Sequence, residues 1–290
     1  MTHPPATPLP HHTADGPEDA PPLLLGPSLG TSLAVWDPQL PSLARHHRVI
    51  RWDLPGHGGT PAGVLGAGLA PTTTVPGLAR RVLGLADALG IDRFAYAGIS
   101  LGGAVGAWLA AHHPERIASL ALLCSSARFG EPAGWHERAA LVREAGLGPV
   151  ADAAASRWFT PAFAHAPQAR ALVDGVRRSV TPAGYAACCD ALAAYDLRAG
   201  LARITAPTLV VAGRDDPATP PAHARELADG IRDARLLELS GAAHLANVER
   251  PAPVRDALLG HLAAHPDNGS PAAAPGHGAP APHPAEGTAQ

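Results

Sequence analysis

Short apolar segments that are typical of strands alternate with helical segments along most of this 290-residue chain. The helical segment 75–90 places Leu78, Val82, Leu85 and Leu89 on one face and ends at Gly90, a common residue just past a helix end. A strand, a helix and a second strand in that order pair in parallel through a right-handed crossover. The sequence therefore predicts an α/β fold with a mostly parallel central sheet and helices on both faces. The predicted strands are 22–26, 47–54, 93–99, 117–125, 206–213 and 234–240.

The composition changes at both ends and in the middle of the chain. Residues 1–21 and 266–290 are rich in Pro, His, Ala and Gly, and such segments bury too little apolar surface to order themselves. We therefore predict a disordered N-terminal arm and a disordered C-terminal tail. Residues 131–201 show helical patterns without a strand pattern. We expect a core formed by residues 22–130 and 202–265, interrupted by a helical cap over 131–201.

The charge, the cysteine content and the lack of long apolar runs argue against a nucleic-acid-binding, disulfide-linked or membrane protein. A formal net charge of −3 does not favour nucleic acid or an anionic membrane as a partner. Three cysteines without a spaced framework favour reduced thiols. The N-terminus lacks the pattern of a secretory signal, and no apolar run is long enough to cross a bilayer. We expect a soluble, cytoplasmic protein that acts on a small molecule, and its oligomeric state stays open.

The pattern Gly98-Ile99-Ser100-Leu101-Gly102 lies where a predicted strand meets a predicted helix. G-x-S-x-G at such a junction is the nucleophile elbow, a tight turn that presents a serine hydroxyl at the carboxyl edge of the sheet. Small neighbours are needed because the turn is strained. A Gly- and Ala-rich chain can produce this pentamer by chance, but its position between strand and helix favours the catalytic interpretation.

A serine nucleophile needs a base and an orienting acid, and in this fold the chain order is Ser, then Asp or Glu, then His. Two aspartates, Asp215 and Asp216, follow the predicted strand 206–213, and His244 follows the strand 234–240. Loop aspartates often cap helices and most histidines lie on surfaces. Three such residues, in this order at three strand ends, favour a catalytic triad with Ser100.

Backbone N–H groups at the same edge are candidates for an oxyanion hole. We expect one from Leu101, directly after the nucleophile, and one from the loop after the first clear strand, where Leu29 is the candidate and Ser28 a further contributor. His57 lies in a turn, 53–60, beside the expected site. We interpret His57 as structural.

Several segments of the chain resemble the α/β-hydrolase family, and more closely the 3-oxoadipate enol-lactonases. The matching text includes "SLGTSLAVWDPQLPSLA", "GISLGGAVGAWLAAHHPERI", "RWFTPAF", "GYAACCDALAAYDLR", "ITAPTLVVAGRDDPATPP" and "AAHLANVERP". These segments span about residues 23–264 and so cover both core and cap. The elbow is common to the whole superfamily, whereas the cap text and "DPATPP" are more specific to the lactonases.

The resemblance implies roles for individual residues. Ser100 resembles the nucleophile, His244 the base and Asp216 the acid, with Asp215 as a bystander. Pro27 departs from the lactonase pattern, which usually has a polar residue before "SLGT"; a proline donates no N–H, so the anchoring of the oxyanion loop stays open. The implied reaction is hydrolysis of 3-oxoadipate enol-lactone to 3-oxoadipate in aromatic catabolism, without cofactor or metal.

The implied substrate carries a carboxylate, which favours a guanidinium partner in a closed pocket. Candidate partners are Arg128, Arg138 and Arg157, with Arg138 as first choice. Trp135 and Trp158 are candidate pocket walls. Each of the five can equally be a surface arginine or a packing aromatic.

Other functions stay open on the same triad. They are a haloperoxidase-like esterase, a carbon–carbon bond hydrolase of ring-cleavage products, and a non-catalytic ligand-binding protein on this fold. An epoxide hydrolase or haloalkane dehalogenase would require Asp in place of Ser100. The tail also allows a linker to a decarboxylase domain, of which this sequence contains nothing.

Overall fold

The computed structural model describes residues 8–65 and 73–266, and its centre is a seven-stranded sheet in the order β1-β3-β2-β4-β5-β6-β7. All neighbouring pairs are parallel except β1 with β3, which is antiparallel. Strands β2 and β4 to β6 are buried along their whole length, which explains why they read as continuous apolar runs. The bounds are β1 His12–Asp15, β2 Pro22–Gly26, β3 Arg48–Trp52, β4 Phe94–Ile99, β5 Ile117–Leu123, β6 Thr208–Gly213 and β7 Ala234–Leu239.

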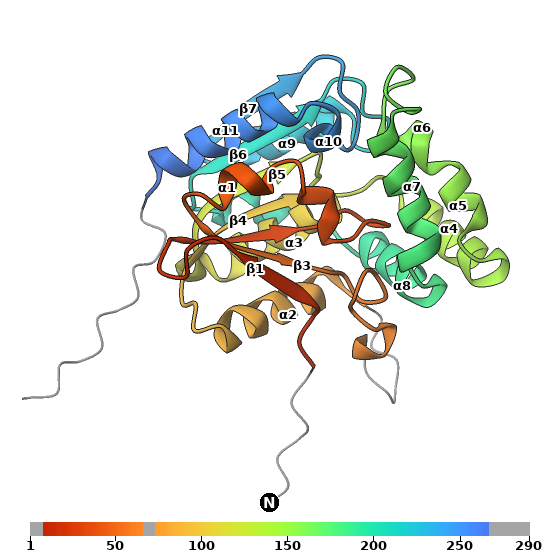
Figure 1. Ribbon diagram of the computed structural model, residues 1–290, viewed down its shortest axis with the longest axis horizontal. Helices are drawn as coiled ribbons and strands as arrows, with labels where there is room; N and C mark the ends of the chain where they lie inside the picture. Colours follow the sequence, from red (N-terminus) through yellow and green to blue (C-terminus); the bar gives the residue numbers. More distant parts are fainter. Residues whose placement is uncertain (1–7, 66–72, 267–290) are drawn as a thin grey trace, which may run out of the picture.

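Helices cover both faces of the sheet (Figure 1). In one layer, α2 packs against α3, and the short helix η4 contacts both α3 and α9. In the other layer, α1 contacts α11. This arrangement confirms the predicted fold class. The bounds are α1 Leu40–Leu43, α2 Val75–Ala88, α3 Leu101–His112, α9 Pro221–Gly230, α10 Ala246–Glu249 and α11 Pro251–Ala264; the 3₁₀ helices are η1 Leu33–Trp36, η2 Ala62–Leu65, η3 Pro114–Arg116 and η4 Arg198–Arg203.

Helix α2 shows how the sequence pattern becomes packing. Leu78, Val82 and Leu85 are buried on the face that was predicted, and Gly90 follows the helix with a φ of +69°. At the other end, the Thr74 side chain accepts a hydrogen bond from the Gly77 N–H. Among the described residues, no helix is long and apolar enough to span a membrane.

Five α-helices, α4 to α8, follow β5 and gather beyond one end of the sheet, the green segment of Figure 1, and η4 then leads to β6. The backbone ties this segment to the core at the turn around His57, which forms an isolated antiparallel bridge with Val180. The Gly58 N–H donates to the Ser179 carbonyl at 2.7 Å. The cap is therefore attached at its α7–α8 junction. Its helices are α4 Pro132–Ala145, α5 Gly148–Asp152, α6 Ala154–Trp158, α7 Pro167–Ser179 and α8 Pro182–Ala193.

The predicted N-terminal arm, 1–21, needs a correction. Strand β1 lies within it and pairs with β3 at the edge of the sheet, with His12 opposite Trp52 and Asp15 opposite Val49. His11, just before β1, contacts the buried carboxylate of Asp53 at 2.7 Å. A four-residue polar edge strand is ordered by its partner strand, which a local pattern does not reveal. Of the predicted tail, 266–290, all but Pro266 lies outside the described residues.

Candidate active site

Ser100 occupies a sharp turn between β4 and α3. Its φ of +54° and ψ of −115° are rare for a residue with a side chain, and its N–H donates to the Leu123 carbonyl at 2.9 Å. The Ser125 hydroxyl donates to the Ser100 carbonyl at 2.8 Å. These contacts hold a strained backbone in place, as expected for a nucleophile elbow.

Two glycines allow this turn to pack closely. A Cβ on Gly98 would lie 2.3 Å from the backbone of Gly102, and a Cβ on Gly102 would lie 2.5 Å from the backbone of Gly26. Both distances are shorter than any real contact permits. The glycines therefore allow α3 to start directly against β2, with its first N–H groups at the serine.

His244 and Asp216 form a buried pair. Their Nδ1 and Oδ2 atoms lie 2.8 Å apart, and their side chains are 5% and 0% exposed. The Asp216 Oδ1 atom accepts the N–H groups of Ala218 at 2.7 Å and Thr219 at 3.0 Å. The Thr219 hydroxyl lies 2.7 Å from Asp216 Oδ2. The carboxylate is thus fixed from three directions.

The protonation state of this pair follows from its surroundings. Burial acts to raise the pKa of the Asp216 carboxyl, but His244 and the hydrogen bonds from Thr219 outweigh it and hold the pKa below the ordinary value. An ionised carboxylate only accepts hydrogen bonds, so His244 Nδ1 carries a proton. Nε2 is then the ring nitrogen that can act as a base toward Ser100. Asp215 makes no such contact; its N–H donates to the Ala242 carbonyl.

The loop that carries Leu29 is held at several points. Pro27 lacks an N–H, but its carbonyl accepts the Gly102 N–H at 3.0 Å. His57 is completely buried, and its Nε2 accepts the Gly30 N–H at 3.2 Å while Nδ1 lies 3.0 Å from the Pro55 carbonyl. Burial lowers the pKa of His57 to about 4, so its ring stays a neutral acceptor at neutral pH. These bonds show how the loop is anchored despite Pro27, and they agree with a structural role for His57.

The expected oxyanion donors are Leu29 and Leu101. The hydrogen bond between Gly102 and Pro27 joins the two segments that carry them. Leu29 lines the pocket that contains Ser100, and Leu101 is the first residue of α3. In the described part of the chain, neither N–H forms a hydrogen bond with a protein acceptor. Both donors are therefore available to a ligand oxygen.

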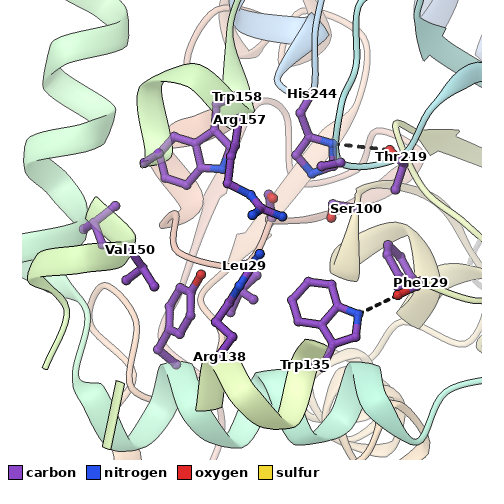
Figure 2. Close-up of a pocket in the computed structure, with 15 residues that line it drawn as sticks. Leu29, Ser100, Phe129, Trp135, Arg138, Val150, Arg157, Trp158, Thr219 and His244 are labelled. Atoms are coloured by element: carbon purple, nitrogen blue, oxygen red, sulfur yellow. Dashed lines mark hydrogen bonds between the residues drawn. The ribbon is translucent and has the colours of Figure 1, made fainter. Parts of the chain in front are cut away.

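Ser100 and His244 line one cavity of about 50 Å³ between core and cap (Figure 2). Arg138 from α4 and Arg157 from α6 point into it and toward each other. Among the described residues neither guanidinium has a carboxylate within 4 Å, and burial, followed by the charge of Arg138, lowers the pKa of Arg157. Two like charges without a counter-ion are costly in a half-buried pocket, so the pocket is arranged for an anion.

The remaining candidates divide into two groups. Trp135 and Trp158 both line the cavity; Trp135 donates its ring N–H to the Phe129 carbonyl, and the Arg138 guanidinium lies 4.7 Å from the centre of its ring. Arg128 does not line the cavity. It pairs with exposed Glu131 at 2.9 Å instead. The structure therefore gathers four of the five candidates and leaves Arg128 outside.

Some residues of the site were not predicted. Tyr185 of α8 lines the cavity beside the two arginines, and burial raises its pKa to about 12, so that it stays neutral. Buried Glu249 accepts the N–H groups of Ala243 and Thr160 and so joins the His244 loop to the cap. Thr219 donates hydrogen bonds from its N–H and its hydroxyl to the Asp216 carboxylate. Of the three, only Thr219 lies close in sequence to a predicted residue, in the turn that the Asp216 side chain closes by accepting the Ala218 N–H.

The chain is similar to known proteins. A family model described as "alpha/beta hydrolase fold" matches residues 21–251. The chain is 39% identical to 3-oxoadipate enol-lactonase 2 of Acinetobacter baylyi over 81% of this chain and 86% of that protein. It is 36% identical to "Putative carbamate hydrolase RutD" of Variovorax paradoxus over 90% and 99%.

A solved structure agrees with the sequence relatives. The crystal structure of the enol-lactonase from Burkholderia xenovorans LB400 superimposes with a TM-score of 0.81 at 38% identity, covering 87% of this chain and 96% of that one. The sheet order, the strained serine turn and the buried Asp–His pair point the same way as these matches. With a seven-stranded sheet and an elbow built on Gly98 and Gly102, the chain belongs to the α/β-hydrolase family.

Proposed function

We propose that this hydrolase opens 3-oxoadipate enol-lactone to 3-oxoadipate through an acyl-enzyme. The observation that carries the proposal is the pair of guanidiniums, Arg138 and Arg157, that share a cavity with Ser100 and His244 and have no counter-ion in the described chain. A neutral ester gives such a pair no partner, whereas a lactone with a carboxylate side chain does. The relatives named as enol-lactonases support the same substrate class.

The chemistry requires no more than the side chains already described. Ser100 Oγ attacks the lactone carbonyl while His244 Nε2 takes its proton, and Asp216 keeps the imidazole oriented and stabilises its charge. The N–H groups of Leu29 and Leu101 stabilise the oxyanion. The ring C–O bond breaks, the enolate accepts the proton and ketonises, and a water activated by His244 releases the second carboxylate.

A second candidate, carbamate hydrolysis, is favoured by the match to the RutD protein, which covers 90% of this chain. The carbamate ion is also an anion and would use the same guanidiniums. The two arginines alone therefore do not separate a lactone from a carbamate.

One assay separates these possibilities. Purified protein is given freshly generated 3-oxoadipate enol-lactone, a small carbamate, a ring-cleavage diketone and 4-nitrophenyl acetate in parallel. We expect kcat/KM on the enol-lactone to exceed that on neutral 4-nitrophenyl acetate by at least about 100-fold, the ratio that an ion pair in a closed pocket supports. We also expect it to be higher than kcat/KM on the carbamate and on the diketone. A preference for any other substrate contradicts the proposal. A covalent serine probe that fails to label Ser100 would favour the non-catalytic alternative.

A further inference from the structure

A second cavity, of about 320 Å³, lies against the cap side of the catalytic pocket. Four residues line both cavities and so form the wall between them: Arg138, Val150, Arg157 and Tyr185. We call the second cavity the vestibule. Its other lining residues include Gly134, Glu137 and Ala153, which are exposed to solvent. The vestibule therefore connects the wall to the outside.

The catalytic cavity, at about 50 Å³, holds only a few waters, so a ligand needs a path into it. A groove of about 360 Å³ runs along η1 and α7, lined by residues such as Gly175 and Leu172. In the described chain this α7 groove shares no lining residue with the catalytic pocket. The vestibule differs from the α7 groove because it shares lining residues with the catalytic pocket.

We propose that the vestibule between α4, α5 and α6 is the site through which ligands reach Ser100, and that the wall of Arg138, Arg157 and Tyr185 selects anions among them. The route itself is independent of the proposed function. The charge selection rests on the proposed function and extends it. In this proposal the two arginines attract an anionic substrate on its way to Ser100 and also hold its carboxylate once it is bound.

The charges along this route support the selection. Arg138, Arg157 and Tyr185 line both cavities, and Tyr185 is neutral because burial raises its pKa to about 12. Glu137, on the solvent side, is the acidic group among the lining residues of the vestibule. An anion therefore passes one carboxylate at the rim and then meets two guanidiniums that have no carboxylate partner among the described residues.

Two glycines provide a matched test of the route. Gly134 in α4 lines the vestibule, Gly175 in α7 lines the α7 groove, and a Cβ at either would meet nothing within 4 Å. Gly134→Trp should block the vestibule and Gly175→Trp should not. Ala153→Trp, from the opposite rim of the vestibule, guards against a local effect of the first variant on Trp135. Thermal midpoints establish that all three variants are folded.

The readout is the second-order rate of covalent labelling of Ser100 by diethyl 4-nitrophenyl phosphate, a neutral probe whose 4-nitrophenolate is released in stoichiometric amount. We expect Gly134→Trp and Ala153→Trp to slow labelling at least tenfold and Gly175→Trp to leave it within twofold. Equal labelling of all three variants and the original protein would overturn the route. Slower labelling of Gly175→Trp alone would place the access path at the α7 groove.

The charge selection is measured with two esters, neutral 4-nitrophenyl acetate and anionic mono-4-nitrophenyl glutarate. Glu137→Gln should raise the acylation rate with the anionic ester about twofold at low ionic strength and leave the neutral ester unchanged. An equal effect on both, or none on either, contradicts anion selection. Because these readouts use no lactone, failure of the proposed function appears separately, as labelling and acylation without lactone turnover.

Discussion

The carbonyl oxygen of Pro27 accepts the N–H of Gly102 at 3.0 Å, and this bond joins the loop of one proposed oxyanion donor to the first turn of the helix that carries the other. The two segments are far apart in sequence and meet because β2 and β4 are neighbours in the sheet. The distance between the donors Leu29 and Leu101 is therefore set by backbone packing, in which glycines at 26, 98 and 102 leave room for the approach.

Gly102→Ala should damage both folding and catalysis. Its Cβ would lie 2.5 Å from backbone atoms of Gly26, so the loop must move, at a cost of roughly 2 kcal/mol in unfolding free energy. A displaced oxyanion donor should lower kcat by up to roughly 100-fold. Gly84→Ala in α2 is the control: its Cβ meets nothing within 4 Å, and stability should rise by about 1 kcal/mol. Denaturant titration and kcat distinguish the two; similar behaviour would contradict the packing argument.

Ser100→Ala should remove activity with little change in stability. The side chain makes no capping hydrogen bond to α3, so its loss should change the unfolding free energy by less than about 1 kcal/mol. The rate should fall on the order of 10³-fold or more, with a remainder from the oxyanion donors. A variant that keeps a tenth of the activity would contradict the assignment of the nucleophile.

Asp216→Asn and Asp215→Asn test which aspartate orients His244. An amide at 216 can offer an N–H to Nδ1, which favours the wrong tautomer and should lower kcat by roughly 10⁴-fold. Asp215 lies beside the pair without touching the imidazole, so its variant should stay within about threefold of the original protein. The reverse order of kcat values would show that the roles are exchanged.

The sequence could place Ser100, Asp216 and His244 at one edge of the sheet because each follows a strand with a clear local pattern, and their catalytic roles stay a prediction. It could not reveal β1, since a four-residue segment with three polar side chains becomes a strand only when β3 is beside it. The role of Arg128 was also not decidable, because whether an arginine faces a pocket or pairs with Glu131 depends on how the chain turns before α4. Tyr185 and Glu249 act through contacts across the cap–core boundary, which no local pattern encodes.

Two buried histidines should make the protein sensitive to moderate acid. Burial lowers the pKa of His57 and of His261 from 6.5 to about 4, and His261 Nε2 has no hydrogen-bond partner in the described structure. The unfolded chain binds protons more readily than the folded one between these values. The contribution of these histidines to the unfolding free energy is therefore fully present above pH 6.5. It declines as the pH falls toward 4, by about 1–3 kcal/mol per histidine.

The check is the denaturant midpoint of His261→Gln across that range. Gln does not titrate, so the variant should lose less stability than the original protein between pH 6.5 and 4. Exposed His46 supplies the control, His46→Gln, whose pH dependence should match that of the original protein. Parallel curves for the original protein and His261→Gln would show that this histidine is not a source of the acid sensitivity.

The arginines provide the sharpest test of the substrate class. Arg138→Met and Arg157→Met each remove one positive charge and keep much of the side-chain volume. Each variant leaves the substrate carboxylate with one guanidinium partner fewer. A lost partner for a buried charge costs roughly 2–5 kcal/mol, or about 30- to several-thousand-fold in kcat/KM. Neutral 4-nitrophenyl acetate makes no such contact and should change by less than about threefold.

Arg128→Met is the matched control, because Arg128 pairs with Glu131 outside the cavity and its loss should leave both substrates unaffected. Stability gives an independent reading of the same pair. Arg138 and Arg157 repel each other, so either Met variant should keep or raise the unfolding midpoint even as it loses the lactone. Loss of both substrates together would indicate damage to the triad or the fold. Unchanged lactone turnover in both Met variants would refute carboxylate recognition by this pair and leave Ser100, His244 and Asp216 as a triad without a known selector.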